Sequence, residues 1–380
     1  FYIPGSDTCI KIGGRVRAEY RYLEPVWDVP GFGREADATG TRARGRINVD
    51  ARTATEWGTL RAFIQVDVTA DSGNYRGQYG PFGESTSVAL DKAYIQWAGI
   101  TAGRISSFFD FYASAINFGS GVMGSLGSDD GSVNTLAYTA TFGNGFSATL
   151  ALEDRSSQNL GVFSGAGNVL AGQRMPSVVA NIRVDQGWGS AQLSGAVQQL
   201  NTLARDINGA FIDSEYGYAI QAGLKFNLPM LAAGDALWLQ AAYADGALAR
   251  LGLGSFTAIG PLGGSAVDGL IINGSIKRTK GWGVTAAFLH YWTPTIRQAV
   301  FGNYTNVDYS GQAVVNYAVD DFKIWTVGTN VIWSPVKAFD IGVEVLYQKL
   351  DPKGRVVLPT GGSKSSVDIW EARIRFQRDF

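Results

Sequence analysis

The sequence predicts an all-β fold, a transmembrane antiparallel β-barrel of about 16 strands. Three observations lead to this prediction. Long segments alternate apolar and charged residues at every second position, as strands with one lipid face and one aqueous face do. The connections between these segments alternate between short and long. Charged residues make up only 17% of the 380 residues, whereas glycine and aromatic residues are abundant.

The clearest strand is the segment 370–380. Trp370, Phe376 and Phe380 belong to an apolar face with aromatic residues near both ends, which suits the two interfaces of a bilayer. The other face is densely charged. A strand that alternates into a final phenylalanine also resembles the C-terminal signal of outer-membrane barrels. Taken alone, the segment would fit the last strand of a soluble sandwich equally well, and its recurrence elsewhere favours the barrel.

The same alternation predicts strands along the whole chain. The first, 10–23, is longer than the 5–6 residues or so of a typical strand. Further strands are predicted at 41–53, 60–68, 88–97, a short segment ending near 104, 133–142, 146–154, 177–185, 189–200, 216–226, 237–244, 270–277, 282–292, 325–333 and 339–349. No run of about 18 apolar residues occurs, so no transmembrane helix is expected. We expect residues 1–380 to form one barrel domain.

The predicted connections differ systematically in length. Short turns are expected at 55–57, 98–99, 143–145, 185–188 and 334–338, and long loops at about 24–39, 71–86, 106–132, 156–174, 201–213, 245–266, 293–320 and 350–366. Short periplasmic turns and long extracellular loops are typical of outer-membrane barrels. A soluble sandwich has little reason to place all its long loops at one edge.

A cluster of cations on the aqueous face of the first three strands indicates a water-filled pore. Nine cations stand against three anions there: Lys11, Arg15, Arg17, Arg21, Arg42, Arg44, Arg46, Arg52 and Arg61, against Glu19, Asp50 and Asp67. Arg104, on the short fifth strand, is assigned to the same cationic wall. Like charges on neighbouring strands repel, so stability alone does not explain the cluster, whereas charges lining a pore select solutes. Pairing with loop acids, or with lipopolysaccharide near the mouth, is the alternative.

The long connection 106–132 carries the second signal. It contains four aromatic residues within five positions and three acids, with no lysine or arginine: Phe108, Phe109, Phe111, Tyr112, Asp110, Asp129 and Asp130. We expect this third loop to fold into the pore, bury its aromatic rings and turn its carboxylates toward the cationic wall, which would create a transverse field. A surface loop that contacts a neighbouring subunit is the alternative.

The composition argues against several other functions. One histidine, His290, and one cysteine, Cys9, leave no zinc cluster and no Cys/His catalytic pair, and the glycine-rich stretches do not form a phosphate loop. A net charge of −1 gives no footprint for nucleic acid. We therefore expect no enzyme activity and no cofactor. Cys9 is either a small apolar side chain or half of a disulfide whose partner lies outside this sequence.

Several segments resemble one family, the alphaproteobacterial general porins. They are FYIPGSDTC at 1–9, AYIQWAG at 93–99, SSFFDFY at 106–112, LAYTATFGNGFSATLALED at 136–154, QRMPSVVANIRVDQGWGSAQLSGAV at 173–197 and RIRFQRDF at 373–380. The resemblance implies a 16-stranded trimeric barrel for passive diffusion across the outer membrane, with the third loop as the constriction. In that family a second cysteine precedes the FYIPG stretch, which favours the disulfide interpretation of Cys9.

The expected function is therefore a diffusion channel for small hydrophilic solutes and ions, weakly selective because both signs of charge face one another. Its expected partners are outer-membrane lipid and lipopolysaccharide, and two further copies of the chain, in contact through Gly14, Ala18, Trp370 and Ala372. A sugar-selective channel, with Phe63, Tyr94 and the aromatic residues of the third loop along its path, is one alternative. A structural or adhesin barrel is another.

Overall fold

Sixteen antiparallel strands close into a barrel, as the sequence predicts. The computed structural model describes residues 5, 7–25, 36–76, 83–119, 124–128, 131–154, 159–164, 167–254, 266–309, 321–354, 356–357 and 363–380. The barrel strands are β1 (Thr8–Leu23), β2 (Thr39–Thr55), β3 (Gly58–Gly73), β4 (Glu84–Trp97), β5 (Ile100–Ser106), β6 (Ser132–Gly143), β7 (Phe146–Glu153), β10 (Ser177–Gln186), β11 (Gly189–Leu200), β12 (Glu215–Asn227), β13 (Ala236–Asp245), β16 (Lys280–Thr293), β17 (Ile296–Asp308), β18 (Phe322–Val336), β19 (Phe339–Pro352) and β22 (Val367–Asp379). Among the described residues, no helix is long and apolar enough to cross a membrane.

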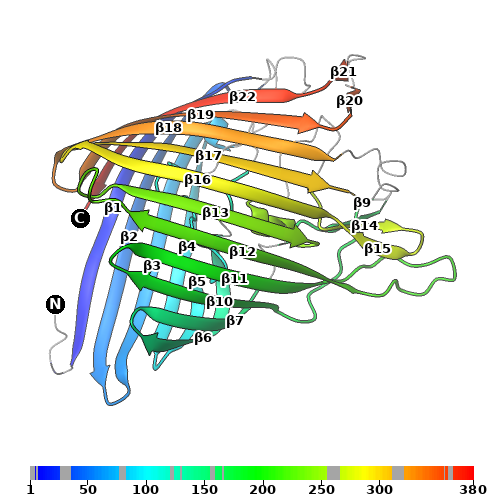
Figure 1. The fold of residues 1–380 in the computed structure, drawn as a ribbon, viewed down its shortest axis with the longest axis horizontal. Coiled ribbons are helices and arrows are strands. Elements are labelled where there is room, and N and C mark those ends of the chain that lie inside the picture. The colour runs from blue at the N-terminus through cyan, green and yellow to red at the C-terminus, as the bar shows by residue number, and fades with distance from the viewer. Residues whose placement is uncertain are drawn as a thin grey trace.

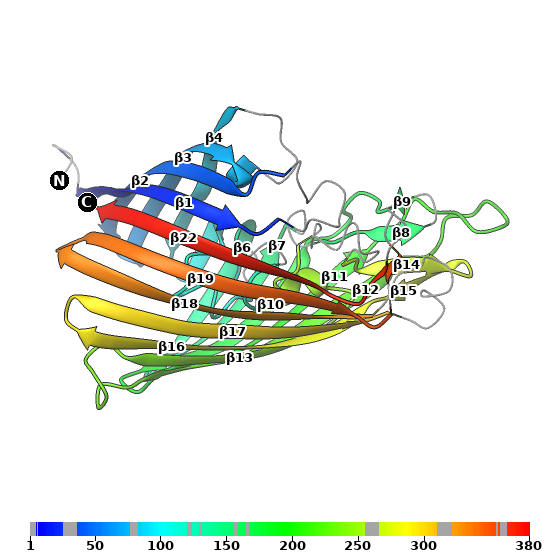
Figure 2. The same cartoon turned by 90° about the horizontal axis from the view of Figure 1, so that it is seen from above.

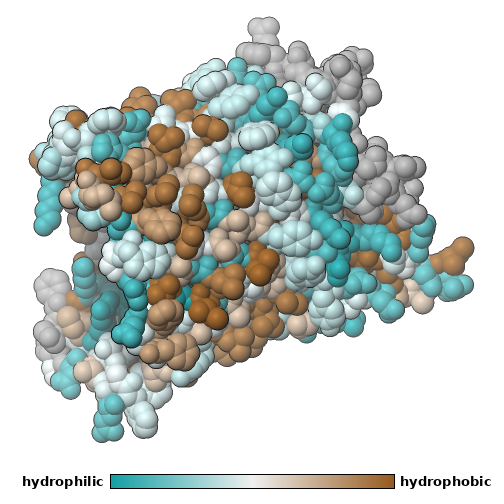
Figure 3. Space-filling view, viewed as in Figure 1, coloured by the Kyte–Doolittle hydropathy of each residue, from teal (hydrophilic) through white to brown (hydrophobic). Residues whose placement is uncertain are grey.

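The two faces of each strand differ as the alternation predicts. On β1, Ile12, Val16 and Tyr20 point outward and are 59%, 58% and 63% exposed, while Glu19 between them is buried inside. Figure 3 shows the same contrast at the surface, where apolar side chains gather over the strands and polar side chains dominate toward the long loops. The outer wall therefore suits lipid, and the inner wall suits water.

The barrel closes where β1 pairs with β22, and Figure 2 shows the two strands side by side. The pairing runs from Arg15 opposite Asp379 to Leu23 opposite Glu371. Beyond it, the backbone of Phe380 exchanges two hydrogen bonds with Gly14, at 2.9 and 3.0 Å. The Phe380 ring lies so close to Gly14 that a Cβ at this glycine would stand only 2.8 Å from the ring.

Short turns join strands at one end of the barrel, and long connections join them at the other (Figure 1). The long connections contain two 3-10 turns, η1 (Asn74–Arg76) and η2 (Leu248–Leu251). They also contain a four-stranded sheet in the order β15–β14–β8–β9, and a two-stranded pair. The strands of these two sheets are β8 (Val162–Ser164), β9 (Gly167–Asn168), β14 (Gly269–Ile272), β15 (Ser275–Arg278), β20 (Val356–Val357) and β21 (Ser363–Lys364).

Two predicted elements were wrong, although the total of sixteen was right. The segment 270–277 is not a barrel strand: it forms the hairpin β14–β15 within a long connection. Conversely, 293–320 is not one long loop, since β17 occupies 296–308 and a two-residue turn joins it to β16.

Both errors have a physical cause. Residues 270–277 contain Asn273–Gly274 with positive φ at both positions, the turn chemistry of a two-residue hairpin. On β17 the inward face carries Ala299 and Phe301, which are buried, while Gln298 lies on the outward face. This mixture hides the alternation of an outer-membrane strand, because part of the inner wall packs against protein rather than water.

Candidate functional site

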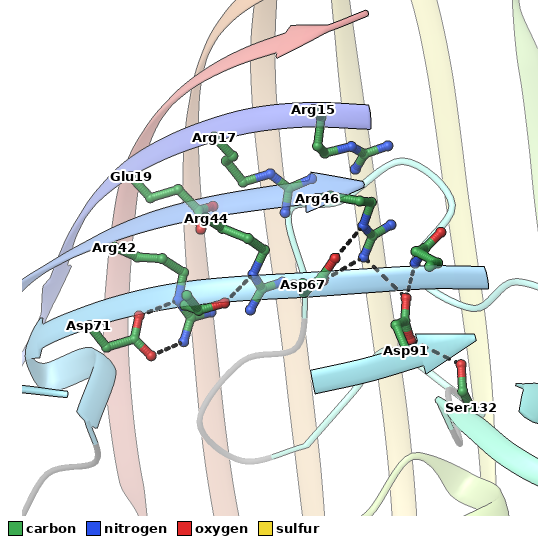
Figure 4. Close-up of polar contacts among 12 residues, drawn as sticks. Arg15, Arg17, Glu19, Arg42, Arg44, Arg46, Asp67, Asp71, Asp91 and Ser132 are labelled. Atoms are coloured by element: carbon green, nitrogen blue, oxygen red, sulfur yellow. Dashed lines mark hydrogen bonds and ion pairs between the residues drawn. The ribbon is translucent and has the colours of Figure 1, made fainter. Parts of the chain in front are cut away.

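The arginines of β1 and β2 form a ladder on the inner wall (Figure 4). Arg15 lies opposite Arg46, Arg17 opposite Arg44, and Glu19 opposite Arg42. Because directly opposed residues share one face of a sheet, these side chains enter the same space. The ladder gives this wall its dense positive charge.

Carboxylates of β3 and β4 neutralise part of the ladder. Arg42 donates two hydrogen bonds to Asp71, at 2.6 and 2.9 Å, and Arg46 donates two to Asp67, at 2.6 and 2.7 Å. Arg46 also lies 3.1 Å from Asp91, at a bulge where β4 shifts register against β3. Asp71 and Asp91 lie outside the set of anions predicted from the sequence, so the net charge of the wall is smaller than predicted.

Two directly opposed arginines of the ladder lack a close carboxylate. Arg17 donates to the side-chain oxygen of Gln377 at 3.0 and 2.8 Å, and it makes no ion pair with any described residue. Arg44 donates to Thr69 Oγ1 at 3.0 Å, and its nearest carboxylate, Asp67, stands 3.8 Å away and is held by Arg46. Among the directly opposed residues of the ladder, uncompensated charge is thus concentrated at Arg17 and Arg44, while Arg21, which also makes no ion pair with a described residue, lies opposite Gly40.

The other predicted cations are distributed around this pair. Arg15 pairs with Asp379 at 3.2 Å. Toward the short turns, Arg52 and Arg61 share Asp50, and the Arg61 guanidinium lies over the stacked rings of Phe63 and Tyr94. Arg21 bonds to Asn74 of η1.

Arg104 does not line the pore, and this is a correction. A two-residue turn, Ala98–Gly99, pairs Trp97 with Ile100, so the even-numbered residues of β5 share the outward face of Trp97. The Arg104 guanidinium donates to the backbone carbonyl of Leu90 at 2.9 Å. That carbonyl lies beside the β4 bulge, where the regular ladder is interrupted.

We call the connection 107–131 the constriction loop, after the role that the resemblance to porins implies for it. Its first part lies against the inner wall formed by β10 to β13, held by side-chain amides. Asn181 donates to the Phe108 carbonyl at 2.6 Å, Gln221 donates to that of Phe109 at 2.9 Å, and Gln192 donates to that of Asp110 at 3.0 Å. On β13, the side-chain oxygen of Gln240 accepts a hydrogen bond from the Tyr112 amide at 2.9 Å.

The loop then continues to the wall formed by β18, β19 and β22. Asn330 donates to the Ile116 carbonyl at 2.8 Å, and Glu344 accepts the Phe118 amide at 2.7 Å. Arg375 donates to the Phe118 carbonyl at 2.6 Å and lies over its ring. Loop residues 114–118 border a cavity of about 340 Å³ whose lining also includes Arg15 and Arg17.

The aromatic residues of this loop face protein. Phe109 and Tyr112 are completely buried, while Phe108 and Phe111 are partly buried. Asp110 accepts a hydrogen bond from Ser128 in the same loop. The two remaining predicted acids, Asp129 and Asp130, lie outside the described residues.

Sequence reasoning missed the polar groups that hold the loop. Asn181, Gln192, Gln221 and Gln240 recur at inward positions of consecutive strands, but uncharged amides are expected on any wet wall and gave no distinct signal. It also missed the buried pair of Glu153 and Arg250, whose two residues lie far apart in the sequence.

Other candidate chemistry receives no support. The described residues contain no group of three or more His, Cys, Asp or Glu side chains able to hold a metal. His290 lies near the short-turn end, with Nδ1 2.6 Å from Asp235 and its ring between Phe288 and Trp292. Cys9 is a half-buried free thiol at the start of β1, and its disulfide stays a prediction.

Comparisons with known proteins agree with this geometry. A family model described as "Porin subfamily" matches residues 1–372. The chain is 31% identical to Porin Omp2b of Brucella suis over 278 residues, which cover 64% of this chain and 72% of that porin. It is 26% identical to Porin Omp2b of Brucella neotomae over 388 residues, covering 100% and 87% of the two chains.

Solved structures share the fold. The outer membrane channel DcaP of Acinetobacter baumannii superposes with a TM-score of 0.74 at 18% identity, covering 100% of this chain and 99% of the other. An anion-selective porin from Comamonas acidovorans gives 0.57 at 12% identity, covering 98% and 100%.

A closed sixteen-stranded barrel with a polar inner wall defines an outer-membrane channel protein. This chain belongs to the porin subfamily and is a β-barrel of the bacterial outer membrane. In such barrels the short turns are periplasmic and the long loops are extracellular, and we expect the same orientation here.

Proposed function

We propose that the barrel is a passive diffusion channel for small hydrophilic solutes and ions, without enzymatic activity. Its narrow part lies between the constriction loop and the cationic wall. The observation that carries this proposal is the course of the loop, whose residues 108–118 bond successively to β10, β11, β12, β13, β18, β19 and β22. The strands that carry the arginine ladder stay uncovered by these contacts.

A sugar-selective channel receives less support. Sugar rings would slide along exposed aromatic faces, yet Phe109 and Tyr112 are fully buried and Tyr94 is nearly so. The loop rings therefore serve to pack the loop against the wall. Saturable block of the ion current by one class of sugar would favour this second function.

We also propose a homotrimer, in contact through the outer face from β22 and β1 to β6. The small residues Gly14, Ala18 and Ala372 and the aromatic Trp370, which the sequence already indicated for this contact, lie on this face. Arg104 and Asn134, which face each other across β5 and β6, add polar groups to the outer wall beside the apolar Leu136 and Ile100. An arginine on a lipid-facing wall costs up to roughly 2–4 kcal/mol, depending on its depth, so contact with protein suits this face better.

Reconstitution into planar bilayers tests the channel. We expect stepwise insertions with large, uniform conductance, and a sharp size limit for neutral polymers that are added to block the current. Protein that inserts as a folded barrel, shown by its heat-modifiable electrophoretic mobility, and yet never conducts would contradict the proposal.

A further inference from the structure

We infer that Arg250 is a positioning residue for the constriction loop, and that the extracellular connection between β13 and β16 thereby helps to set the width of the pore. The inference rests on the proposed function, because it concerns what holds the narrowest part of that pore in place. Arg250 belongs to η2, in the long connection that follows β13, and its side chain is one of the largest that are fully buried.

The first contact is at the start of the constriction loop. Glu153, the last residue of β7, is fully buried and accepts hydrogen bonds from Ser107 Oγ at 2.9 and 3.1 Å and from the Phe108 amide at 2.9 Å. The Arg250 guanidinium completes this cluster, with Nη1 3.0 Å from Ser107 Oγ and 3.4 Å from the Glu153 carboxylate. The beginning of the loop is therefore fixed between a barrel strand and an extracellular connection.

Arg250 also contacts the first buried ring of the loop. Its guanidinium lies 5.1 Å from the centroid of the Phe109 ring, while Gln192 and Gln221 hold the Phe109 carbonyl from the wall. Phe109 is thus held from two sides, by the barrel and by η2. A cation over a desolvated ring adds attraction to the ion pair.

A second, separate contact lies on the returning part of the constriction loop. The Ser125 amide donates to the carbonyl of Gly252, two residues after Arg250, at 2.8 Å. Gly252 has a φ of +80°, and a Cβ there would stand 2.0 Å from the Gly127 carbonyl oxygen. Only glycine allows this close approach, so the segment 250–252 touches both the outgoing and the returning parts of the loop.

The segment itself is held firmly enough to act as a support. The buried carboxylate of Asp268 accepts from the Leu248 amide at 2.8 Å and from the Leu160 amide at 2.9 Å. Leu248 and Leu251 are buried in one apolar cluster that also contains Phe109. The described residues of the extracellular connections are therefore in direct contact with the constriction loop through packed side chains.

Removing one partner of a buried ion pair leaves the other charge without compensation, which is strongly destabilising for the local structure. Because the ion pair is made by side chains and Arg250 belongs to no barrel strand, replacing Arg250 should loosen the loop and leave the barrel folded. The expected result is alternation of the loop between positions, which single-channel recording reports directly as sublevels of current.

The test compares Arg250→Met, which removes the charge, with Gly252→Ala, which keeps every charge and blocks only the second contact. Arg250→Lys restores a cation without the planar fork that reaches both Ser107 and Glu153. Arg205→Met is the matched control, because Arg205 is a loop arginine that stacks on Phe211 at 3.8 Å without touching the constriction loop. Each barrel is first shown to fold by its heat-modifiable mobility.

We expect one steady conductance for the unmodified protein and Arg205→Met. Arg250→Met and Gly252→Ala should each show frequent sublevels, several-fold greater open-channel noise and a changed polymer size limit, with Arg250→Lys between the two groups. Folded Arg250→Met and Gly252→Ala channels with unmodified conductance, noise and size limit would overturn the inference and leave the channel function standing. An unmodified protein that never conducts would overturn the proposed function, and the inference with it.

Discussion

Arg17 of β1 stands directly opposite Arg44 of β2 on the inner wall, and neither holds a carboxylate of its own. Like charges in this position repel, and sheets normally avoid the arrangement. Their neighbours differ, because Asp71 and Asp67 neutralise Arg42 and Arg46. We therefore expect the field across the pore to depend more on this pair than on the number of arginines in the ladder.

The first prediction concerns ion selectivity. The double variant Arg17→Gln with Arg44→Gln should shift the reversal potential in a salt gradient clearly toward cations, because it removes the two uncompensated charges. The shift should shrink at high salt, where the Debye length falls to about 3 Å at 1 M.

The control for this prediction is the double variant Arg42→Gln with Asp71→Asn, which removes an ion pair without changing the net charge. It should leave the reversal potential nearly unchanged. An equal shift in both double variants would show that wall shape, and not uncompensated charge, controls selectivity.

The second prediction concerns the fit between the loop and its wall. A Cβ at Gly223 of β12 would lie 2.3 Å from the Phe111 ring, so Gly223→Ala must push this ring away from the wall. We expect a lower single-channel conductance as the loop moves into the pore. Gly195→Ala, on the adjacent strand, meets no atom closer than 4.0 Å and should conduct normally. A normal conductance for Gly223→Ala would mean that the loop yields without narrowing the channel.

The third prediction tests the trimer. If Arg104 contacts a neighbouring subunit, Arg104→Leu should lower the temperature at which the trimer dissociates during electrophoresis in detergent. If the same wall faces lipid, removing the charge should instead stabilise the protein by about 2–4 kcal/mol. Arg205→Leu, at an exposed loop position, should change neither the dissociation temperature of the trimer nor the stability of the protein. The sign of the change decides between the two environments.

The fourth prediction concerns pH. The Tyr75 ring of η1 lies between the guanidinium groups of Arg21 and Arg42, each 4.3 Å from its centroid. Burial raises the pKa of the Tyr75 phenol above its usual value. The neutral phenol therefore contributes stability that is present below pH 10 or so, the pKa of an unfolded tyrosine, and is lost as the pH rises through the folded pKa.

Tyr75→Phe should consequently lose less stability than the unmodified protein between neutral and strongly alkaline pH. The measurement is the difference in Tm between the two proteins at each pH. Because the buried hydroxyl has no hydrogen-bond partner among the described residues, the substitution should cost little at neutral pH. If the plots of Tm against pH run parallel for the two proteins, Tyr75 is not the titrating group.

The sequence was sufficient for the barrel because lipid and water act on opposite faces of each strand. On β1 and on residues 370–377 of β22 that contrast is clear, and the predicted facing is correct. On β17 it is absent, because Phe301 packs inward with other apolar side chains where water was expected. Alternation therefore identifies a strand only when two different solvents lie on its two sides.

The candidate site was less predictable for a related reason. The arginines of β1 and β2 could be assigned from local spacing, but their partners Asp71 and Asp91 depended on register and on a bulge in β4. Arg104 was assigned wrongly, although the two-residue turn before β5 already determined its facing. Contacts such as Arg250 with Glu153 arise only when extracellular connections fold over the barrel, and no local pattern encodes them.

The seam between β1 and β22 has a consequence for biogenesis. It joins strands from opposite ends of the described chain, so the contact that closes the ring is the most non-local one in the fold. Contacts of this kind form slowly. Until they form, both margins of the curved sheet expose unpaired N–H and C=O groups, which can template pairing with other chains. We therefore expect the open sheet to need protection from pairing with other unfolded chains during export. Closure of the seam between β1 and β22 removes the exposed edges and ends the risk of aggregation.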